Sequence, residues 1–187
     1  MKKRILELGL VAVLCGATAE VAPAQALATA SGPGSYASVG GGYSWMKSDY
    51  GNRLLGGAFI FADVHPHWRY GFEGEVRYLR VHSDLGVTQT TYLGGAQVYL
   101  RPGSLRPYAK VLAGLGHLNF PFSYGTGSYL VIATGAGVEV GLDDRVSIRM
   151  LDFEYQQWPQ FTYGSLHPYG FSAGVNYRLN RVRRFPK

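Results

Sequence analysis

The sequence predicts an all-β fold in which eight antiparallel strands close into an up-and-down barrel. Apolar and polar residues tend to alternate in eight stretches between residues 36 and 179. Side chains on a strand point alternately to opposite faces, so each stretch gives a sheet with one apolar and one polar face. The connections are short and show no helical period, so neighbouring strands must be antiparallel. Closing eight such strands into a barrel removes the exposed edges of the sheet.

A secretory leader precedes the strands. Residues 2–4 are basic, an apolar run follows, and Ala24-Gln25-Ala26 supplies the small residues of a cleavage site. We therefore expect a cleaved signal peptide over residues 1–26, with Ala28 as a second candidate for the cleavage position. The only cysteine, Cys15, lies in this leader, so the exported chain has no disulfide. Residues 27–180 are assigned to the barrel and residues 181–187 to a basic C-terminal tail.

The first two predicted strands differ in how clearly their faces separate. In the first, Val39 and Tyr43 alternate with Ser38 and Ser44, so one face is apolar and the other polar. In the second, residues 59–61 are all apolar and both faces look alike. The eight strands are expected near residues 36–47, 54–64, 69–82, 88–101, 107–119, 128–141, 145–157 and 168–179.

The third strand gives the clearest pattern. Phe72 and Val76 share one face, whereas Glu73 and Glu75 share the other. The fourth strand repeats this arrangement with Tyr92, Ala96, Val98 and Leu100 opposite Gln89, Thr91, Gln97 and Arg101. A sheet built from such strands has charged groups on one side only.

The last four strands follow the same pattern with one irregularity. The fifth and sixth strands are rich in glycine, which in a strand marks bends and close approach. In the seventh strand Arg149 lies an odd number of positions from Asp152, so strict alternation would put the two on opposite faces. A β-bulge near Met150 would bring Arg149, Asp152 and Glu154 to one side. The eighth strand alternates regularly up to Leu179.

Alternation alone does not say which face of the sheet lines the interior of the barrel and which faces its surroundings. A soluble exported carrier of the lipocalin type turns its apolar face inward around a small apolar ligand, whereas a membrane barrel turns it outward to lipid. The strand lengths match the roughly 9–11 residues that a tilted strand needs to cross hydrocarbon. Aromatic residues also gather near strand ends, as in the interfacial belts of membrane barrels: Trp45, Tyr50, Trp68, Tyr70, Tyr124, Tyr129, Trp158, Tyr163 and Tyr169. These features favour a transmembrane β-barrel.

The final strand adds a motif. Ser172, Gly174, Tyr177 and Leu179 fit the polar, glycine, aromatic and apolar spacing of an assembly signal. On this motif and the strand layout, the chain resembles the eight-stranded outer-membrane barrels of the OmpA/OmpX type, although eight residues follow Leu179. The resemblance implies export through the periplasm to the bacterial outer membrane and insertion by the barrel assembly machinery. It also implies contact with outer-membrane lipid and a monomeric state, and we expect no nucleic-acid partner.

On the membrane interpretation, the charged residues of the polar faces meet in the lumen. An eight-stranded barrel is filled by its own side chains, and buried charges must be paired. We therefore expect a salt-bridge network rather than an open channel, with a gated pore as the alternative. The expected members are Glu73, Glu75, Arg77, Lys110, Glu139, Arg149, Asp152 and Glu154.

Other functions find little support in the sequence. His65-Pro66-His67 offers two imidazoles but no third metal ligand nearby, so we interpret it as a turn at the membrane interface and expect no metal or cofactor. His82 and Ser83 form no recognisable nucleophile and base pair, so we expect no enzyme. The connections expected on the outer side are short for an adhesin: 48–53, 82–88, 120–128 and 158–167. A structural, membrane-integrity or porin-like small-solute role remains.

Overall fold

The computed structural model describes residues 35–49, 53–81, 87–119, 126–159 and 164–179. The predicted signal peptide and basic tail lie outside these residues. The described chain forms eight strands close to the predicted ranges. They are β1 (Tyr36–Lys47), β2 (Leu54–His65), β3 (Tyr70–Val81), β4 (Thr88–Tyr99), β5 (Leu105–Asn119), β6 (Thr126–Gly141), β7 (Val146–Gln157) and β8 (Tyr169–Arg178).

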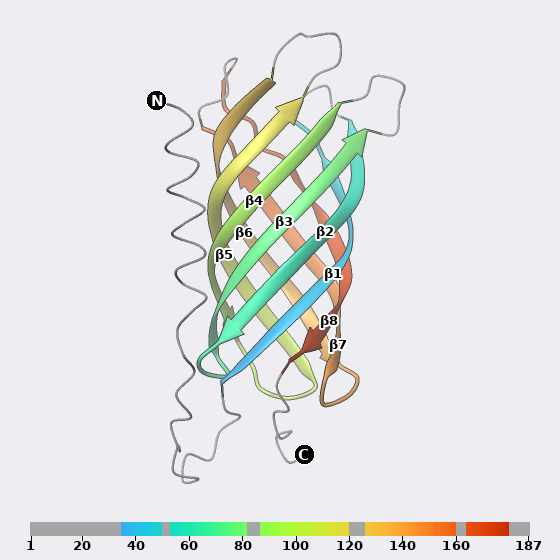
Figure 1. Cartoon of the computed structure of the whole chain (residues 1–187), viewed down its shortest axis with the longest axis vertical. Helices are drawn as coiled ribbons and strands as arrows, with labels where there is room; N and C mark the ends of the chain where they lie inside the picture. Colours follow the sequence, from blue (N-terminus) through green and yellow to red (C-terminus); the bar gives the residue numbers. More distant parts are fainter. Residues whose placement is uncertain (1–34, 50–52, 82–86, 120–125, 160–163, 180–187) are drawn as a thin grey trace. The chain divides into compact units, whose positions relative to one another are not determined.

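The strands form one closed barrel in sequence order, as Figure 1 shows. Each strand pairs antiparallel with the next, and β8 pairs with β1 from Ser38↔Arg178 to Lys47↔Tyr169. No sheet edge is left open, which satisfies the backbone of every strand. The predicted fold class is confirmed. Among the described residues, no helix is long and apolar enough to span a membrane.

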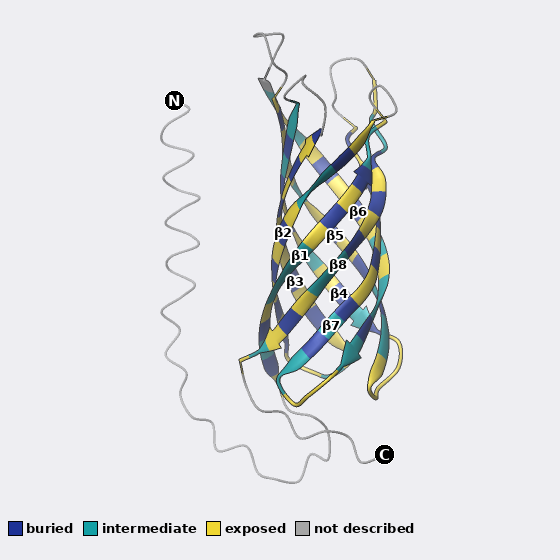
Figure 2. Ribbon diagram, turned by 90° about the vertical axis from the view of Figure 1, so that its right-hand side faces the viewer, coloured by how far each residue is buried: buried dark blue, intermediate teal, exposed yellow. Residues whose placement is uncertain are grey.

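Buried and exposed positions alternate along the strands, as the banding in Figure 2 shows. In β3, Phe72 is 64% exposed whereas the neighbouring Glu73 is 2% exposed. Val76 likewise faces outward between the buried Glu75 and Arg77. The apolar face is therefore the outer wall and the charged face lines the lumen. A soluble carrier requires the opposite arrangement.

The structure resolves the second strand, where the sequence left both faces alike. Ile60 faces outward, whereas Phe59 and Phe61 are buried in the lumen. Both phenyl rings lie against guanidinium groups, with Arg77 Cζ 5.7 Å from the Phe59 ring and Arg149 Cζ 3.7 Å from the Phe61 ring. These inward aromatic residues therefore belong to the charged interior, where they cover cations.

The predicted bulge in the seventh strand is confirmed. The pairing of β7 with β8 shifts register between Arg149 and Asp152. Met150 and Leu151 are both exposed on the outer wall, so Arg149 and Asp152 both enter the lumen. The extra outward residue thus keeps three charged residues of β7 on one side.

The lumen has two chemically different halves. We call the end where β1 begins and β8 ends the near end, and the opposite end the far end. Charged and polar residues fill the near half and the middle, whereas two apolar clusters fill the far half. The first cluster is Leu93, Leu112, Leu118, Val131, Ala133 and Trp158. The second is Met46, Leu55, Leu79 and Val81.

Trp158 corrects one part of the predicted aromatic belt. Trp45, Tyr70 and Tyr169 do face outward at strand ends, as a belt requires, but Trp158 is fully buried and the partly buried Tyr129 packs against it. The predicted members Tyr50, Tyr124 and Tyr163 lie outside the described residues. Its indole Nε1 donates a hydrogen bond to Gln156 Oε1 at 3.0 Å, and its ring lies against the backbone of Gly116. Trp158 continues the inward parity of Glu154 and Gln156 just beyond the end of β7, where it bridges to Leu166.

Candidate functional site

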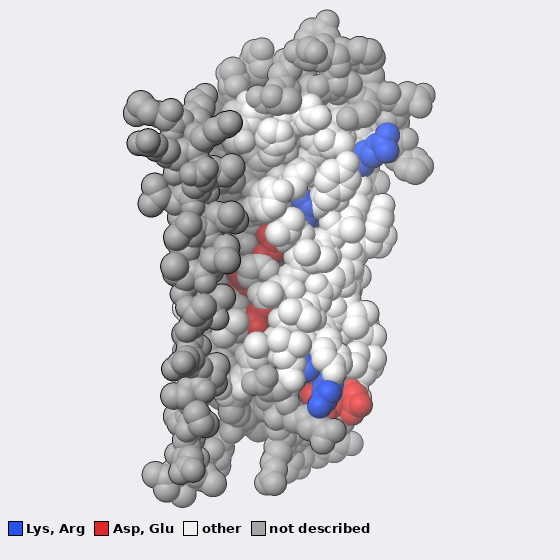
Figure 3. Space-filling model, in the orientation of Figure 1, with Lys and Arg blue, Asp and Glu red and all other residues white. Residues whose placement is uncertain are grey.

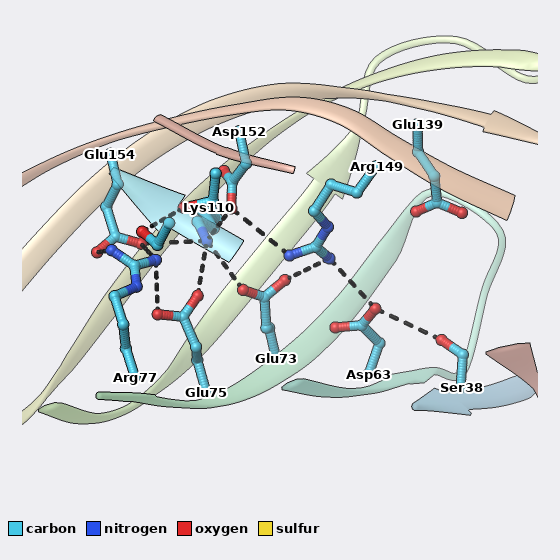
Figure 4. Close-up of polar contacts among 12 residues, drawn as sticks. Ser38, Asp63, Glu73, Glu75, Arg77, Lys110, Glu139, Arg149, Asp152 and Glu154 are labelled. Carbon is cyan, nitrogen blue, oxygen red and sulfur yellow. Dashed lines mark hydrogen bonds and ion pairs between the residues drawn. The ribbon is translucent and has the colours of Figure 1, made fainter. Parts of the chain in front are cut away.

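All eight residues of the predicted charge network are buried at inward positions. They come from four strands: Glu73, Glu75 and Arg77 from β3, Lys110 from β5, Glu139 from β6, and Arg149, Asp152 and Glu154 from β7. Figure 4 shows most of them converging from opposite walls of the barrel, with Glu139 set apart. The interior is thus cross-linked by side chains whose strands are not neighbours.

Lys110 lies at the centre of this network. Its Nζ contacts one carboxylate oxygen each of Glu73 at 3.0 Å, Glu75 at 3.2 Å, Asp152 at 2.8 Å and Glu154 at 3.2 Å. The lysine is fixed on β5, whereas its partners are on β3 and β7. One ammonium group therefore joins three parts of the wall.

The Lys110 ammonium group also neutralises a carboxylate cluster whose spacing resembles a metal site. The carboxylate oxygens of Glu75, Asp152 and Glu154 lie within 4.8 Å of one another, a spacing that suits a cation. Lys110 Nζ already contacts all three carboxylates. The ammonium group therefore supplies the positive charge that an ion would otherwise bring.

Two arginines complete the central network. Arg77 makes a two-pronged contact with Glu154, at 2.9 and 3.1 Å, and a third contact with Glu75 at 2.7 Å. Arg149 contacts Glu73 at 2.8 Å and Asp63 at 3.4 Å. The planar guanidinium group suits such paired contacts.

Asp63 is a member that the sequence analysis missed. It lies on β2, directly opposite Glu73 in the register with β3, and it is buried. Its Oδ2 also accepts a hydrogen bond from Ser38 at 3.4 Å. The signal was present, since Asp63 lies two positions after Phe61, but the apolar middle of β2 concealed which parity faces the lumen.

Glu139 belongs to a separate cluster at the near end of the barrel. Its carboxylate pairs with Arg106 and accepts hydrogen bonds from Tyr99 at 2.7 Å and Ser147 at 2.5 Å. Arg178 lies 4.0 Å away. Among the described residues, no ion pair joins Glu139 to the central network. The eight predicted residues therefore divide into two clusters, and the main partners of Glu139 were not predicted.

The histidine pair is also placed differently from the prediction. His65 is no turn residue: it is the last residue of β2, and its ring is buried against Tyr36, with centroids 4.6 Å apart. Tyr99 covers it from another side at 5.1 Å. His67 is exposed beyond the strand. One imidazole thus lies in the lumen and the other outside it, so the two do not share a face.

The residues of the proposed assembly signal divide between the two faces of β8. Ser172 is inside, and its hydroxyl lies 2.8 Å from that of Ser44. Gly174 packs against β1, while Tyr177 and Leu179 are exposed on the outer wall. This placement gives an outward aromatic and apolar pair at the end of the last strand. Its role in assembly stays a prediction.

Comparison with known proteins identifies the family. The family model described as the outer membrane protein beta-barrel domain matches residues 10–178. The chain belongs to this family. With its apolar outer wall and charged lumen, it is a barrel of the bacterial outer membrane. No curated protein matches the chain.

Solved structures agree with this fold at low sequence identity. Neisserial surface protein A superposes with a TM-score of 0.64 at 12% identity, covering 76% of this chain and 96% of that chain. The attachment invasion locus protein Ail of Yersinia pestis gives 0.52 at 19%, covering 79% and 99%. OprG of Pseudomonas aeruginosa gives 0.52 at 10%, covering 80% and 98%. At identities this low the superpositions show a shared fold and nothing about a shared role.

Proposed function

We propose that this protein is a closed structural barrel that supports the integrity of the outer membrane and does not conduct solutes. The observation that carries the proposal is the filled lumen. Arg77 and Arg149 in the middle and Trp158 toward the far end are all fully buried. An eight-stranded barrel has room for little beyond its own side chains.

The two halves of the lumen close it by different physical means. In the middle, an entering ion would have to break contacts that Lys110 makes with four carboxylates. Toward the far end, it would have to pass two clusters of buried apolar side chains. A chain of hydrogen bonds from Glu154 through Gln156 to Trp158 joins the two parts. These contacts favour the structural role over the porin-like one.

We further propose that the near end faces the periplasm, that the barrel works as a monomer and that it has no enzymatic activity. The short connections at the near end support the orientation. The β4–β5 connection contains the tight turn Pro102-Gly103-Ser104, in which Gly103 has a φ of 124°. Periplasmic turns of outer-membrane barrels are short in the same way.

Single-channel recording tests the proposal. The refolded protein is added to a planar bilayer, with a general porin as the positive control. We expect no stable conductance steps from the wild-type barrel. The conductance of Trp158→Ala, which lacks the ring buried toward the far end, is compared with that of Trp45→Ala, which lacks an exposed ring of the same kind. Regular conductance steps from the folded wild-type protein would contradict the structural role and support the porin-like one.

A cellular measurement tests the integrity role itself. Deleting the gene from its host is expected to increase entry of a large antibiotic or a detergent, and restoring the wild-type gene is expected to reverse this. Unchanged permeability in the deletion strain, with correct expression in the parent, would contradict a role in membrane integrity.

A further inference from the structure

The outer wall carries a trough over β3, β4 and β5 near the near end. A cavity of about 300 Å³ opens there among outward-facing Tyr70, Phe72, Ala96, Val98 and Val111. Phe72 and Val111 are 64% and 56% exposed, so they form the sides of the trough and not its floor. Figure 3 shows a face of the barrel covered mainly by uncharged atoms, between which a few acidic atoms are visible at mid-height. This face of the wall is thus mainly apolar.

The register between the strands explains the trough. Ala96 of β4 pairs with Phe72 of β3, and the next outward pair toward the far end is Gly74 with Gly94. A side chain at Gly74 would meet no atom within 4 Å, so open space lies above it. Beyond these glycines, the next large outward side chain of β4 toward the far end is Tyr92, which is 56% exposed. The small outward residues of β4 thus leave an apolar surface of low relief next to the cavity.

The open end of the trough carries positive charge. The lining extends to Pro66 and His67 in the β2–β3 connection. Arg69 follows in the same connection, is exposed and lies over the Tyr70 ring, with Cζ 5.7 Å from its centroid. Its backbone N–H donates to His67 Nδ1 at 3.4 Å. A guanidinium group held at the mouth of an apolar trough matches an anion that carries a hydrocarbon chain.

We propose that this trough is a binding site for an anionic glycerophospholipid, with one acyl chain lying along β4 and the phosphate at Arg69. The wall lies in a membrane, so hydrocarbon is the material that fills an apolar trough there. Arg69 selects a phosphate at the height where headgroups begin. The site depends on membrane residence alone; the proposed orientation adds only that the lipid belongs to the periplasmic leaflet.

Spin-label spectroscopy tests the site. The barrel is reconstituted in phosphatidylcholine vesicles that contain a trace of chain-labelled phosphatidylglycerol, or of the same labelled phosphatidylcholine. The wild-type barrel is expected to immobilise a larger fraction of the labelled phosphatidylglycerol. Ala96→Trp fills the trough and should abolish this excess, whereas Ala58→Trp makes the same change elsewhere on the exposed wall and should keep it.

The charge is tested separately. Arg69→Gln should reduce the immobilised phosphatidylglycerol to the phosphatidylcholine value, whereas Arg145→Gln, in the turn between β6 and β7, should not. A gel shift on heating confirms that each variant is folded, and Ala109→Phe replaces Ala96→Trp if the latter does not fold. The site is disproved if the wild type shows no excess, or if the control variants lose it equally. Chemical cross-linking into dimers that Ala96→Trp prevents would assign the trough to a second copy instead. A conducting wild-type barrel would overturn the proposed function and leave this test unaffected.

Discussion

At the scale of single residues, the interior is arranged around three buried cations. Lys110, Arg77 and Arg149 serve five carboxylates of the central network, so carboxylates are in surplus. Removing Lys110 therefore raises this surplus and leaves each of its four carboxylate partners with a single arginine contact, whereas neutralising one carboxylate reduces the surplus. The two kinds of change should have unequal effects on stability.

Lys110→Met tests this inequality. It removes the ammonium group but keeps an apolar side chain of similar length, and it is expected to lower the free energy of unfolding by about 3–5 kcal/mol. Glu75→Gln should cost clearly less, because Lys110 and Arg77 keep other carboxylate partners. Urea unfolding in lipid vesicles, followed by tryptophan fluorescence, measures both. Equal losses for the two variants would contradict the central place of Lys110.

Substitution of Arg149 separates the contribution of the planar guanidinium group to stability from that of its charge. Its guanidinium group lies on the Phe61 ring while it contacts Glu73, so planarity serves both contacts. Arg149→Lys keeps the charge but loses the planar stacking, and about 2 kcal/mol of destabilisation is expected. Arg145→Lys, at a partly exposed turn position, should change the unfolding free energy very little. If both variants unfold at the wild-type urea concentration, the stacking contributes nothing.

At the scale of strands, glycines on the two faces have different roles. Gly116 faces the lumen, where a Cβ would collide with the ring of Trp158, whereas Gly74 faces open space. Gly116→Ala should therefore displace Trp158 and destabilise the barrel by about 1–3 kcal/mol. Gly74→Ala is the matched control and should be neutral or slightly stabilising. Indole fluorescence reports the displacement, and urea unfolding reports the energy; a neutral Gly116→Ala would contradict the tight contact.

The last strand makes a prediction about assembly. Tyr177→Ala is expected to slow insertion by the assembly machinery, because it removes the aromatic residue of the proposed signal. Phe171→Ala removes another exposed aromatic ring from the same strand and should assemble faster than Tyr177→Ala. Pulse-labelled cells analysed on unheated gels give the folded fraction over time. Identical time courses for the two variants would remove the special role of Tyr177.

At the scale of the whole molecule, closure and burial act together. Every strand has two hydrogen-bonded neighbours, so unfolding one strand opens the ladder on both sides. The folded barrel is therefore expected to survive detergent without heating and to change its gel mobility when boiled. The central ion pairs are fully buried, so salt should screen them weakly and the urea midpoint should move little in 1 M salt. A large loss of stability in salt would indicate an interior open to water.

Much of the fold could be predicted because a strand reports its two faces through period-two alternation. The ranges of the strands, the inward side of β3 and the bulge after Arg149 follow from residue order alone. Asp63 was missed because β2 carries aromatic residues on its inner face, which concealed its inward parity. The aromatic rings of β2 pack against arginines from other strands, and a local sequence pattern contains no information about such partners.

The sequence by itself determined the barrel: strand number, antiparallel order and an apolar wall all follow from composition and spacing along the chain. Only the tertiary structure decided which charges meet. Partners such as Lys110 and Asp152 come from strands that are not neighbours, so their contact depends on strand tilt and on the stagger accumulated around the closed sheet. The same stagger places Glu139 in its own cluster and aligns small residues of neighbouring strands into the trough. Alternation is a property of neighbours in sequence, whereas these contacts are properties of barrel closure.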